Sequence, residues 1–281
     1  MRPCYRVPLL ALALAALLPV AAAATVGVPI PIKNLHCNDA NGVTTMLNQT
    51  VTVRGIVTGQ FPTTGAASST RLYIEDSGGG VNIFGSPLYC GGLGDDITVT
   101  GVVQQYNGLV EVGSVVGPPA VNLVITVNSI GNPQPPARHM SISEIKAIVS
   151  AGQCEPYESW LVSISACVIK SSAGGAPPAT FDCTAGQNLR LCDAGDLSNY
   201  ITLRINKDMP NTCPLVDPLN GVAIPTGTLC VLGVLSQFIG TSPYNGGWQL
   251  MPRRPADIVP VSECVTPVKP TTWGQIRRLY R

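Results

Sequence analysis

The residues whose types and spacing favour ligand binding are arginines and aromatic residues that alternate with apolar residues along short segments. Successive side chains of a strand face opposite sides, so Leu72, Ile74, Val81 and Ile83 are expected to face a core. The outward residues of these segments and of a neighbouring one are Arg54, Arg71, Tyr73, Asn82 and Phe84. The same alternation later in the chain gives Arg190, Tyr200 and Arg204. Arginine beside aromatic rings suits stacking on unpaired bases, which makes these residues the predicted ligand face. The alternative is that they are solvated or covered by loops.

Residues suited to nucleophilic or acid–base catalysis are few. The two histidines, His36 and His139, are predicted to be solvated loop residues, and the chain contains no G-x-S-x-G motif. Glu75 and Asp76 are adjacent along a predicted strand and therefore face opposite sides. The pair 95–96 (Asp-Asp) is expected to fix a turn before a strand. The sequence therefore predicts no catalytic residues and a protein that is not an enzyme.

Two loops concentrate oxygen-bearing side chains, at 38–42 (Asn-Asp-Ala-Asn-Gly) and 193–196 (Asp-Ala-Gly-Asp). Neither follows the spacing and closing glutamate of a calcium-binding loop. Asp, Asn and Gly are also the residues that tight turns require. Turn formation is favoured over calcium binding, so no metal site and no cofactor are predicted.

Cysteines are unevenly distributed beyond residue 24. They are Cys37, Cys90, Cys154, Cys167, Cys183, Cys192, Cys213, Cys230 and Cys264. No pair has the C-x-x-C spacing of a metal site, so disulfides are favoured over metal binding. Cys37 with Cys90 is the expected pair of the first half. The second half has room for three bridges and an odd thiol, with the connectivity left open.

The first 24 residues have the layout of a cleaved secretory signal peptide. Arg2 and Arg6 precede an apolar run over 9–20, and small alanines follow it. This predicts a secreted or cell-surface protein in an oxidising environment. No apolar run is long enough for a comfortable membrane span.

Charge is low overall and unequal along the chain. The 281 residues include 17 Lys+Arg and 16 Asp+Glu, and only 12% are charged. Residues 25–139 carry four basic and six acidic side chains, and 140–264 carry seven and ten, whereas 265–281 carry four and none. The predicted folded body is therefore acidic, which disfavours nucleic acid because phosphate contacts normally supply most non-specific affinity.

Alternating segments separated by Gly, Asn and Pro predict short strands in an order that occurs twice. The first set is 51–57, 71–76, 81–84, 97–104 and 109–112. The second set is 160–165, 188–192, 200–205, 227–235 and 248–251. A short helix over 143–151, capped by Ser143, is expected between them.

This repeat resembles the OB-fold, a five-stranded Greek-key barrel. The stretches TVTVRGIVT (50–58), YIEDSGGGVNIF (73–84) and EPYESWLV (155–162) resemble tandem OB-fold modules of secreted bacterial proteins, a type also attached to extracellular nucleases. The resemblance implies an all-β protein with two tandem OB-like barrels in domains 25–137 and 138–264. It also implies that the second and third strands of each barrel carry the ligand face.

The C-terminal segment 265–281 is predicted to be a linker and a basic, aromatic tail. Thr272 and Gln275 have the spacing of a helix capping box. The predicted docking residues are Trp273, Ile276, Arg277, Arg278, Leu279 and Tyr280. A docking or sorting segment that orders on a partner is one interpretation, and it resembles C-terminal tags of secreted bacterial proteins. A frayed terminus is the other.

These observations together favour a non-enzymatic, exported binding protein with an unknown ligand on its barrel faces and a surface or export partner for its tail. The alternative is a single-stranded nucleic-acid-binding accessory of extracellular nuclease systems. The Arg and aromatic pattern favours the alternative, and the acidic body disfavours it.

Overall fold

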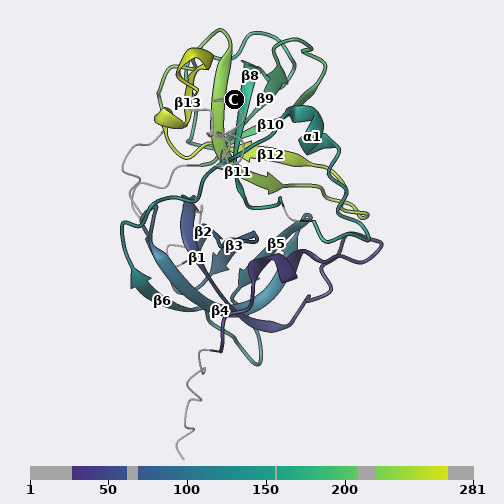
Figure 1. Ribbon diagram of the computed structural model, residues 1–281, viewed down its shortest axis with the longest axis vertical. Coiled ribbons are helices and arrows are strands. Elements are labelled where there is room, and N and C mark those ends of the chain that lie inside the picture. Colours follow the sequence, from purple (N-terminus) through teal and green to yellow (C-terminus); the bar gives the residue numbers. More distant parts are fainter. Residues whose placement is uncertain (1–26, 62–68, 156, 208–218, 265–281) are drawn as a thin grey trace, which may run out of the picture.

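The computed structural model describes residues 27–61, 69–155, 157–207 and 219–264 (Figure 1). The predicted signal peptide, the docking residues of the tail and Cys213 lie outside these ranges. Two β-barrels lie one above the other in Figure 1, and each is built from one half of the predicted repeat.

Barrel 1 closes in the strand order β1–β2–β3–β5–β4–β1. Its strands are β1 (Thr50–Gln60), β2 (Thr70–Glu75), β3 (Gly80–Gly85), β4 (Asp96–Tyr106) and β5 (Leu109–Gly113). The pairing of β3 with β5 is parallel and the others are antiparallel. A sixth strand, β6 (Val124–Ser129), pairs with the outer edge of β4.

Barrel 2 repeats this closure in the order β8–β9–β10–β12–β11–β8, again with one parallel pairing, β10 with β12. Its strands are β8 (Leu161–Lys170), β9 (Gln187–Asp193), β10 (Tyr200–Ile205), β11 (Leu229–Gln237) and β12 (Trp248–Met251). Short strands β7 (Arg138–His139) and β13 (Ile258–Pro260) extend it. The prediction of two tandem five-stranded OB-type barrels is confirmed. The predicted domain boundary at residue 137 falls between β6 and β7.

The barrel cores follow the predicted alternation. Leu72, Ile74, Val81 and Ile83 are all fully buried in the core of barrel 1. The corresponding residues of β9 and β10 in barrel 2 are Leu189, Leu191, Ile201 and Leu203, which are also buried. Because each strand buries one face, the pleat fixes which side chains point away from each barrel.

The only α-helix among the described residues is α1 (Ile142–Lys146), which is shorter than predicted. Its N-cap is Ser141 and not Ser143. The Glu144 amide donates to the Ser141 hydroxyl, and the Ser141 amide donates to the Glu144 carboxylate. This capping box requires a glutamate three residues after the serine, which only Ser141 has. Three 3-10 helices complete the described chain: η1 (Ile32–His36), η2 (Pro255–Asp257) and η3 (Val261–Glu263).

The two oxygen-rich loops are stabilised as turns. The Asp39 carboxylate accepts the amides of Asn41 and Val43, and the Asp193 carboxylate accepts the amide of Gly195. These contacts are those of aspartate-stabilised turns, as the favoured interpretation predicted. Asp95 fixes its turn in the same way by accepting the Gly92 amide.

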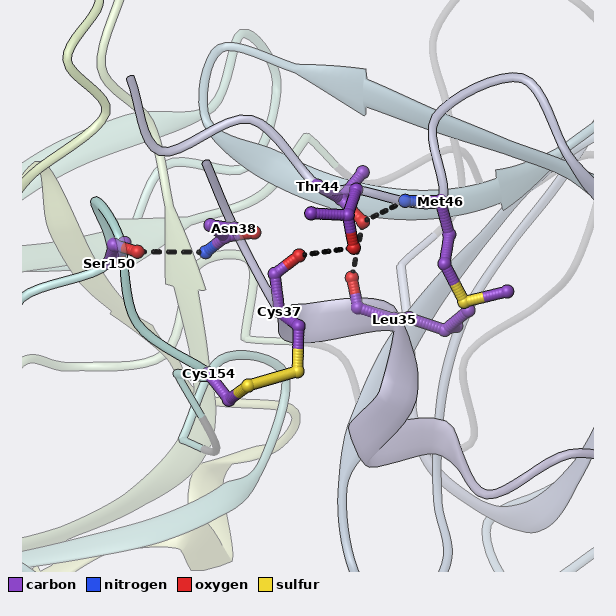
Figure 2. The surroundings of a disulfide bond; sticks show 8 residues. Leu35, Cys37, Asn38, Thr44, Met46, Ser150 and Cys154 are labelled. Carbon is purple, nitrogen blue, oxygen red and sulfur yellow. Dashed lines mark hydrogen bonds between the residues drawn. A yellow bond between two sulfur atoms is a disulfide. The ribbon is translucent and has the colours of Figure 1, made fainter. Parts of the chain in front are cut away.

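One disulfide joins the two halves of the chain and corrects the predicted pairing. Cys37 is bonded to Cys154 and not to Cys90. The reason is local, because the segment after η1 pairs with the loop before β8 through an antiparallel bridge at these two cysteines. Figure 2 shows this disulfide beside Asn38, whose side-chain amide donates to the Ser150 carbonyl on the other side of the same junction.

The remaining cysteines also differ from expectation. Cys230 is bonded to Cys264, and Cys90 is disulfide-bonded as well. Cys167 and Cys192 are buried thiols. Cys154 is bonded to barrel 1 and Cys167 and Cys192 are thiols, so too few cysteines remain for the three bridges expected within the second half. The disulfides fit an oxidising compartment.

The barrels pack directly on each other through a small apolar cluster. Phe61, Tyr73 and Leu109 of barrel 1 contact Val234 and Met251 of barrel 2. The Tyr73 hydroxyl lies 3.1 Å from the Ser236 hydroxyl, and the rings of Phe61 and Tyr73 meet edge to face. The outer face of β2 in barrel 1 is therefore covered by β11 and β12 of barrel 2. Among the described residues, no helix has the length and apolar character needed to span a bilayer.

Candidate binding cleft between the barrels

The loops that follow the fourth strand of each barrel meet at one end of the interface. Gln105 and Tyr106 end β4, and Gln237 and Phe238 occupy the equivalent place at the end of β11. The side-chain amide of Gln105 donates to the Gly108 carbonyl, and that of Gln237 donates to the Gly246 carbonyl. Each glutamine therefore hydrogen-bonds a carbonyl of its own loop, and the aromatic side chain that follows it is exposed to solvent.

The two aromatic rings touch each other across the junction. Tyr106 is 61% exposed and Phe238 is 56% exposed, and their ring centroids lie 6.3 Å apart in an edge-to-face arrangement. The Ile239 amide donates to the Asn107 carbonyl, which joins the backbones of the two loops. OB barrels commonly use this loop for ligands, and here two such loops contact each other.

Beside these rings lies a cavity of about 290 Å³ between the barrels. Its lining comes from both halves of the chain: Arg71, Tyr106, Leu109, Glu111, Asn188, Arg204, Asn206, Gln237, Phe238 and Gln249. We call this the inter-barrel cleft. It brings together Arg71 and Arg204, which the sequence analysis placed on separate ligand faces.

The inter-barrel cleft concentrates positive charge. Burial, and next the like charge of Arg71, lowers the pKa of Arg204 from its ordinary value. The Arg71 guanidinium makes no hydrogen bond or ion pair to another described residue, and among these residues the Arg204 guanidinium donates only to the neutral Asn188 side chain. Two guanidinium groups that repel each other and lack a carboxylate hydrogen bond favour an anion between them.

The acidic residue of the cleft is partly neutralised by its surroundings. Burial raises the pKa of Glu111 to about 7, and the nearby charge of Arg71 opposes this rise. Asn206 adds a donor, because its buried side-chain nitrogen has no hydrogen-bond partner among the described residues. The cleft thus offers more donors than acceptors to a ligand.

The open face of barrel 2 continues from the cleft. Cross-strand register places Asn188 opposite Arg204, and Arg190 opposite Thr202, on the outer face of β9 and β10. The Arg190 guanidinium lies 4.2 Å from the centroid of the Tyr200 ring, a cation–π contact on a ring that is 37% exposed. The outer face of β9 and β10 in barrel 2 is therefore partly exposed, whereas the equivalent face of β2 in barrel 1 is covered by barrel 2.

The predicted ligand face of barrel 1 is only partly exposed. Tyr73 and Asn82 do point away from the barrel core, but both are fully buried against the rest of the molecule, so neither can stack on a base. Arg54 is exposed outside the cleft and is ion-paired with Asp96 at 2.6 Å. Phe84 is 37% exposed on β3, in register with Arg71.

The residues that the sequence analysis missed are Tyr106, Asn206 and Phe238. A pattern for two of them was present, because a Gln-aromatic pair occurs at the end of the fourth strand in both halves. Apposition of the two pairs depends on barrel packing, which no local pattern reports.

A second hollow of about 770 Å³ lies beside α1. It is lined by Arg138, His139, Met140, Glu144, Ala147, Ile148 and Tyr157. Its principal cation, Arg138, already lies 3.5 Å from the centroid of the Trp160 ring. The predicted ligand residues do not line this hollow, so the inter-barrel cleft is the stronger candidate for an anionic ligand.

The histidines occupy different environments. His139 is exposed, as predicted, and lies near the hydroxyls of Ser163 and Ser165. The prediction of a solvated His36 is wrong, since it is 1% exposed. η1 packs against β3, which places His36 beside Glu155 and Glu158 of the loop before β8.

Comparison with known proteins shows similarity to an endonuclease sequence. No family model matches the chain. The chain is 28% identical over 250 residues to the endonuclease YhcR of Bacillus subtilis (strain 168), a match that covers 86% of this chain and 17% of that protein. The chain therefore spans a small part of the length of this curated relative.

Solved structures give weaker likenesses. The Ifi202 HINa domain in complex with 20bp dsDNA is 11% identical, with 72% of this chain and 93% of that chain covered and a TM-score of 0.30. A structure described as structural mimicry for functional antagonism is 12% identical, with 73% and 89% covered and a TM-score of 0.31. These scores are too low to carry a conclusion about ligand or function.

Proposed function

We propose that this chain is an exported, non-enzymatic binding module that holds single-stranded nucleic acid in the inter-barrel cleft and along the open face of barrel 2. The observation that carries the proposal is the convergence of Arg71 and Arg204 beside the exposed rings of Tyr106 and Phe238. A single strand offers phosphates for the guanidinium groups and unpaired bases for the rings.

The shape of the site favours a single strand over a duplex. The cleft is a cavity of about 290 Å³ between two packed barrels, large enough for one base or phosphate group but not for a double helix. Beyond it, Arg190 and Tyr200 provide a second stacking position on the outer face of barrel 2. A strand can therefore pass from the cleft onto β9 and β10.

The comparison with YhcR supports the same class of ligand. That relative is named an endonuclease, and the match includes most of this chain but a small part of the relative. A segment that recurs beside other regions of a larger protein is suited to an accessory role, such as holding a substrate strand. We therefore propose binding, and not strand cleavage, for this chain.

The acidic composition weakens this proposal less than the formal charge indicates. Burial raises the pKa of both Glu75 and Glu111 to about 7, so each is partly neutral near that pH. The local field at the cleft is set by Arg71 and Arg204, whose charges are fixed. We expect modest affinity and a shallow salt dependence, since few phosphates are contacted.

The test is fluorescence anisotropy of a labelled oligothymidylate with the mature protein across a salt series. Arg204→Ala and Arg71→Ala should each weaken binding by roughly 5- to 30-fold and lower the salt slope by about 0.7, the loss of one phosphate contact on a single strand. Arg54→Ala is the matched control, because it removes an equal charge from an exposed position outside the cleft.

Two results would contradict the proposal. One is no binding at low salt by the unaltered protein. The other is an equal effect of Arg54→Ala and Arg204→Ala, which would mean that only overall charge matters. Preference for duplex over single strand would reject the single-strand assignment.

A further inference from the structure

A buried group of three metal-ligating side chains lies where η1 meets the loop before β8, and none of the three lines the inter-barrel cleft. His36 comes from η1, and Glu155 and Glu158 come from the loop before β8. One potential ligand atom from each lies within 4.8 Å of the others, and all three residues are at most 3% exposed. Both glutamates belong to the EPYESWLV stretch (155–162), which contributed to the resemblance to OB-fold modules but contains no predicted ligand residue.

The hydrogen bond that His36 makes through Nε2 leaves the lone pair of Nδ1 directed toward this group. His36 Nε2 lies 2.6 Å from the Gly80 carbonyl, which can only accept, so Nε2 carries a proton. In the neutral ring Nδ1 is then an acceptor, and it lies 3.6 Å from Oε1 of Glu158, outside hydrogen-bond distance. Two buried lone-pair atoms that face each other are stabilised when a proton or a metal cation lies between them, and an imidazole nitrogen and a carboxylate oxygen are both metal-ligand types.

The histidine arrangement is the one found around bound metals. A ligating imidazole usually donates its other ring N–H to a carbonyl or carboxylate, which fixes the tautomer and the orientation of the ring. Nδ1 of His36 and Oε1 of Glu158 lie 3.6 Å apart. Two ligand atoms of a tetrahedral zinc site lie about 3.4 Å apart when each zinc–ligand distance is near 2.05 Å, so the observed separation is close to the expected one.

The carboxylates are also held in place before any ion binds. Glu155 accepts the amides of Tyr157 and Glu158, and Glu158 accepts the amide of Val110 from β5. Each ionised carboxylate has lone pairs to spare beyond these contacts. No lysine or arginine forms an ion pair with either carboxyl group among the described residues.

The neighbouring disulfide fixes the distance between the two chain segments. Cys37 follows His36 directly and Cys154 precedes Glu155, so the bond of Figure 2 connects the residues next to two of the three side chains. The Glu155 amide also donates to the His36 carbonyl at 2.9 Å. The site is therefore assembled by the same junction that joins the barrels.

We propose that His36, Glu155 and Glu158 bind one divalent transition-metal ion, with Zn²⁺ as the preferred ion, and that this ion stabilises the junction of the barrels. One imidazole and two carboxylates form a mixed nitrogen and oxygen donor set that suits zinc better than magnesium, which prefers oxygen alone. Because all three side chains are buried, the role of the ion is structural.

The test uses the mature chain without an affinity tag, stripped with a chelator and then supplied with Zn²⁺ or Mg²⁺. After gel filtration, elemental analysis should find one zinc per chain, and Zn²⁺ should raise Tm by roughly 5 °C or more, with little response to Mg²⁺. No bound zinc together with an unchanged Tm would overturn the proposal, as would an equal response to the two ions.

Variants locate the ion. Glu158→Gln and His36→Gln should lose the bound zinc and the Tm response. Glu75→Gln, which alters another buried glutamate between the barrels outside the group, should keep both. Retention of zinc by Glu158→Gln and His36→Gln would overturn the assignment.

A spectroscopic measurement on the unaltered protein covers the case in which these variants do not fold. Co²⁺ bound by nitrogen and oxygen should show visible bands that Zn²⁺ displaces, without thiolate charge-transfer bands. Thiolate bands would place the ion on cysteine and reject this site. None of these readouts involves nucleic acid, so the metal site and the proposed function succeed or fail separately.

Discussion

Tyr106 and Phe238 owe their exposure to the residues before them. Gln105 and Gln237 use their amide groups to hold the loops, and the aromatic ring that follows each is left facing solvent at the cleft. Single residues elsewhere were correctly predicted from alternation, such as the buried Leu72 and Ile74. Alternation gives the direction of a side chain and not what covers it, which is why Tyr73 was wrongly predicted to be open.

Replacing Tyr106 should distinguish the contribution of base stacking to binding from that of phosphate contacts. We expect Tyr106→Ala to weaken oligothymidylate binding by about 1 to 2 kcal/mol, because base–aromatic stacking contributes on this scale. The salt slope should stay unchanged, since no phosphate contact is lost, whereas Arg204→Ala lowers it. Anisotropy titrations at three salt concentrations measure both quantities. Unaltered affinity in Tyr106→Ala would exclude the ring from the site.

Glu75 should make stability depend on pH. Burial raises its pKa to about 7 from 4.5, with the Leu161 amide and the charge of Arg138 opposing the rise and Asp76 adding to it. The folded protein therefore holds a proton that the unfolded chain releases between these values. As pH rises through this window, the free energy of unfolding should fall by about 3 kcal/mol from this group.

The variant Glu75→Gln checks this expectation, because the amide oxygen can still accept the Leu161 amide without ionising. Urea unfolding with chelator present should show Glu75→Gln more stable than the unaltered protein at pH 8 and similar at pH 5. Glu144→Gln, at an exposed carboxyl whose pKa is lowered by the Ser141 amide, serves as the control and should not gain stability at pH 8. A Glu75→Gln protein with an unchanged pH profile would show that Glu75 stays ionised.

At the scale of elements, all ten predicted strands are present within a few residues of their predicted ends. The strands β6, β7 and β13 were not predicted, because β6 is largely exposed and β7 and β13 are two or three residues long. Such edge strands lack the alternating burial from which strands are recognised. The start of β3 is set by a close approach, because the backbone of Ser159 lies directly against Gly80.

Gly80→Ala should therefore disturb the contact between β3 and the loop before β8. A Cβ at this position would overlap the backbone carbonyl of Ser159, which cannot move as a flexible side chain can. We expect a loss of about 2 to 4 kcal/mol in the free energy of unfolding, measured by urea denaturation. Gly240→Ala is the control, since a Cβ there meets no atom within 4 Å and should change stability little.

At the scale of the whole molecule, the two barrels form one body held by three kinds of contact. An apolar cluster around Tyr73 and Met251 packs the barrel faces, and the buried Arg253 guanidinium donates to the Thr58 carbonyl across the interface. The disulfide of Cys37 with Cys154 adds a covalent bond. A fixed arrangement of the barrels is what allows Arg71 and Arg204 to share one cleft.

Removing that disulfide should cost more stability than removing the other described one. The Cys37–Cys154 bond spans 117 residues and Cys230–Cys264 spans 34. Loop-closure entropy predicts losses of up to about 5 and about 4 kcal/mol in the paired Cys→Ser variants. Thermal unfolding of Cys37→Ser/Cys154→Ser and Cys230→Ser/Cys264→Ser compares them directly. The reverse order would mean that native contacts, and not the unfolded chain, dominate.

The sequence by itself determined the strand order, the repeat, the buried alternation and hence two barrels of the OB type, because strand period and turn residues act over a few positions. Only the tertiary structure decided that barrel 2 covers Tyr73, that Cys37 meets Cys154, and that His36 lies beside Glu155 and Glu158. These contacts join residues far apart in the chain. They depend on how two finished barrels pack, and neither local propensity nor spacing carries that information.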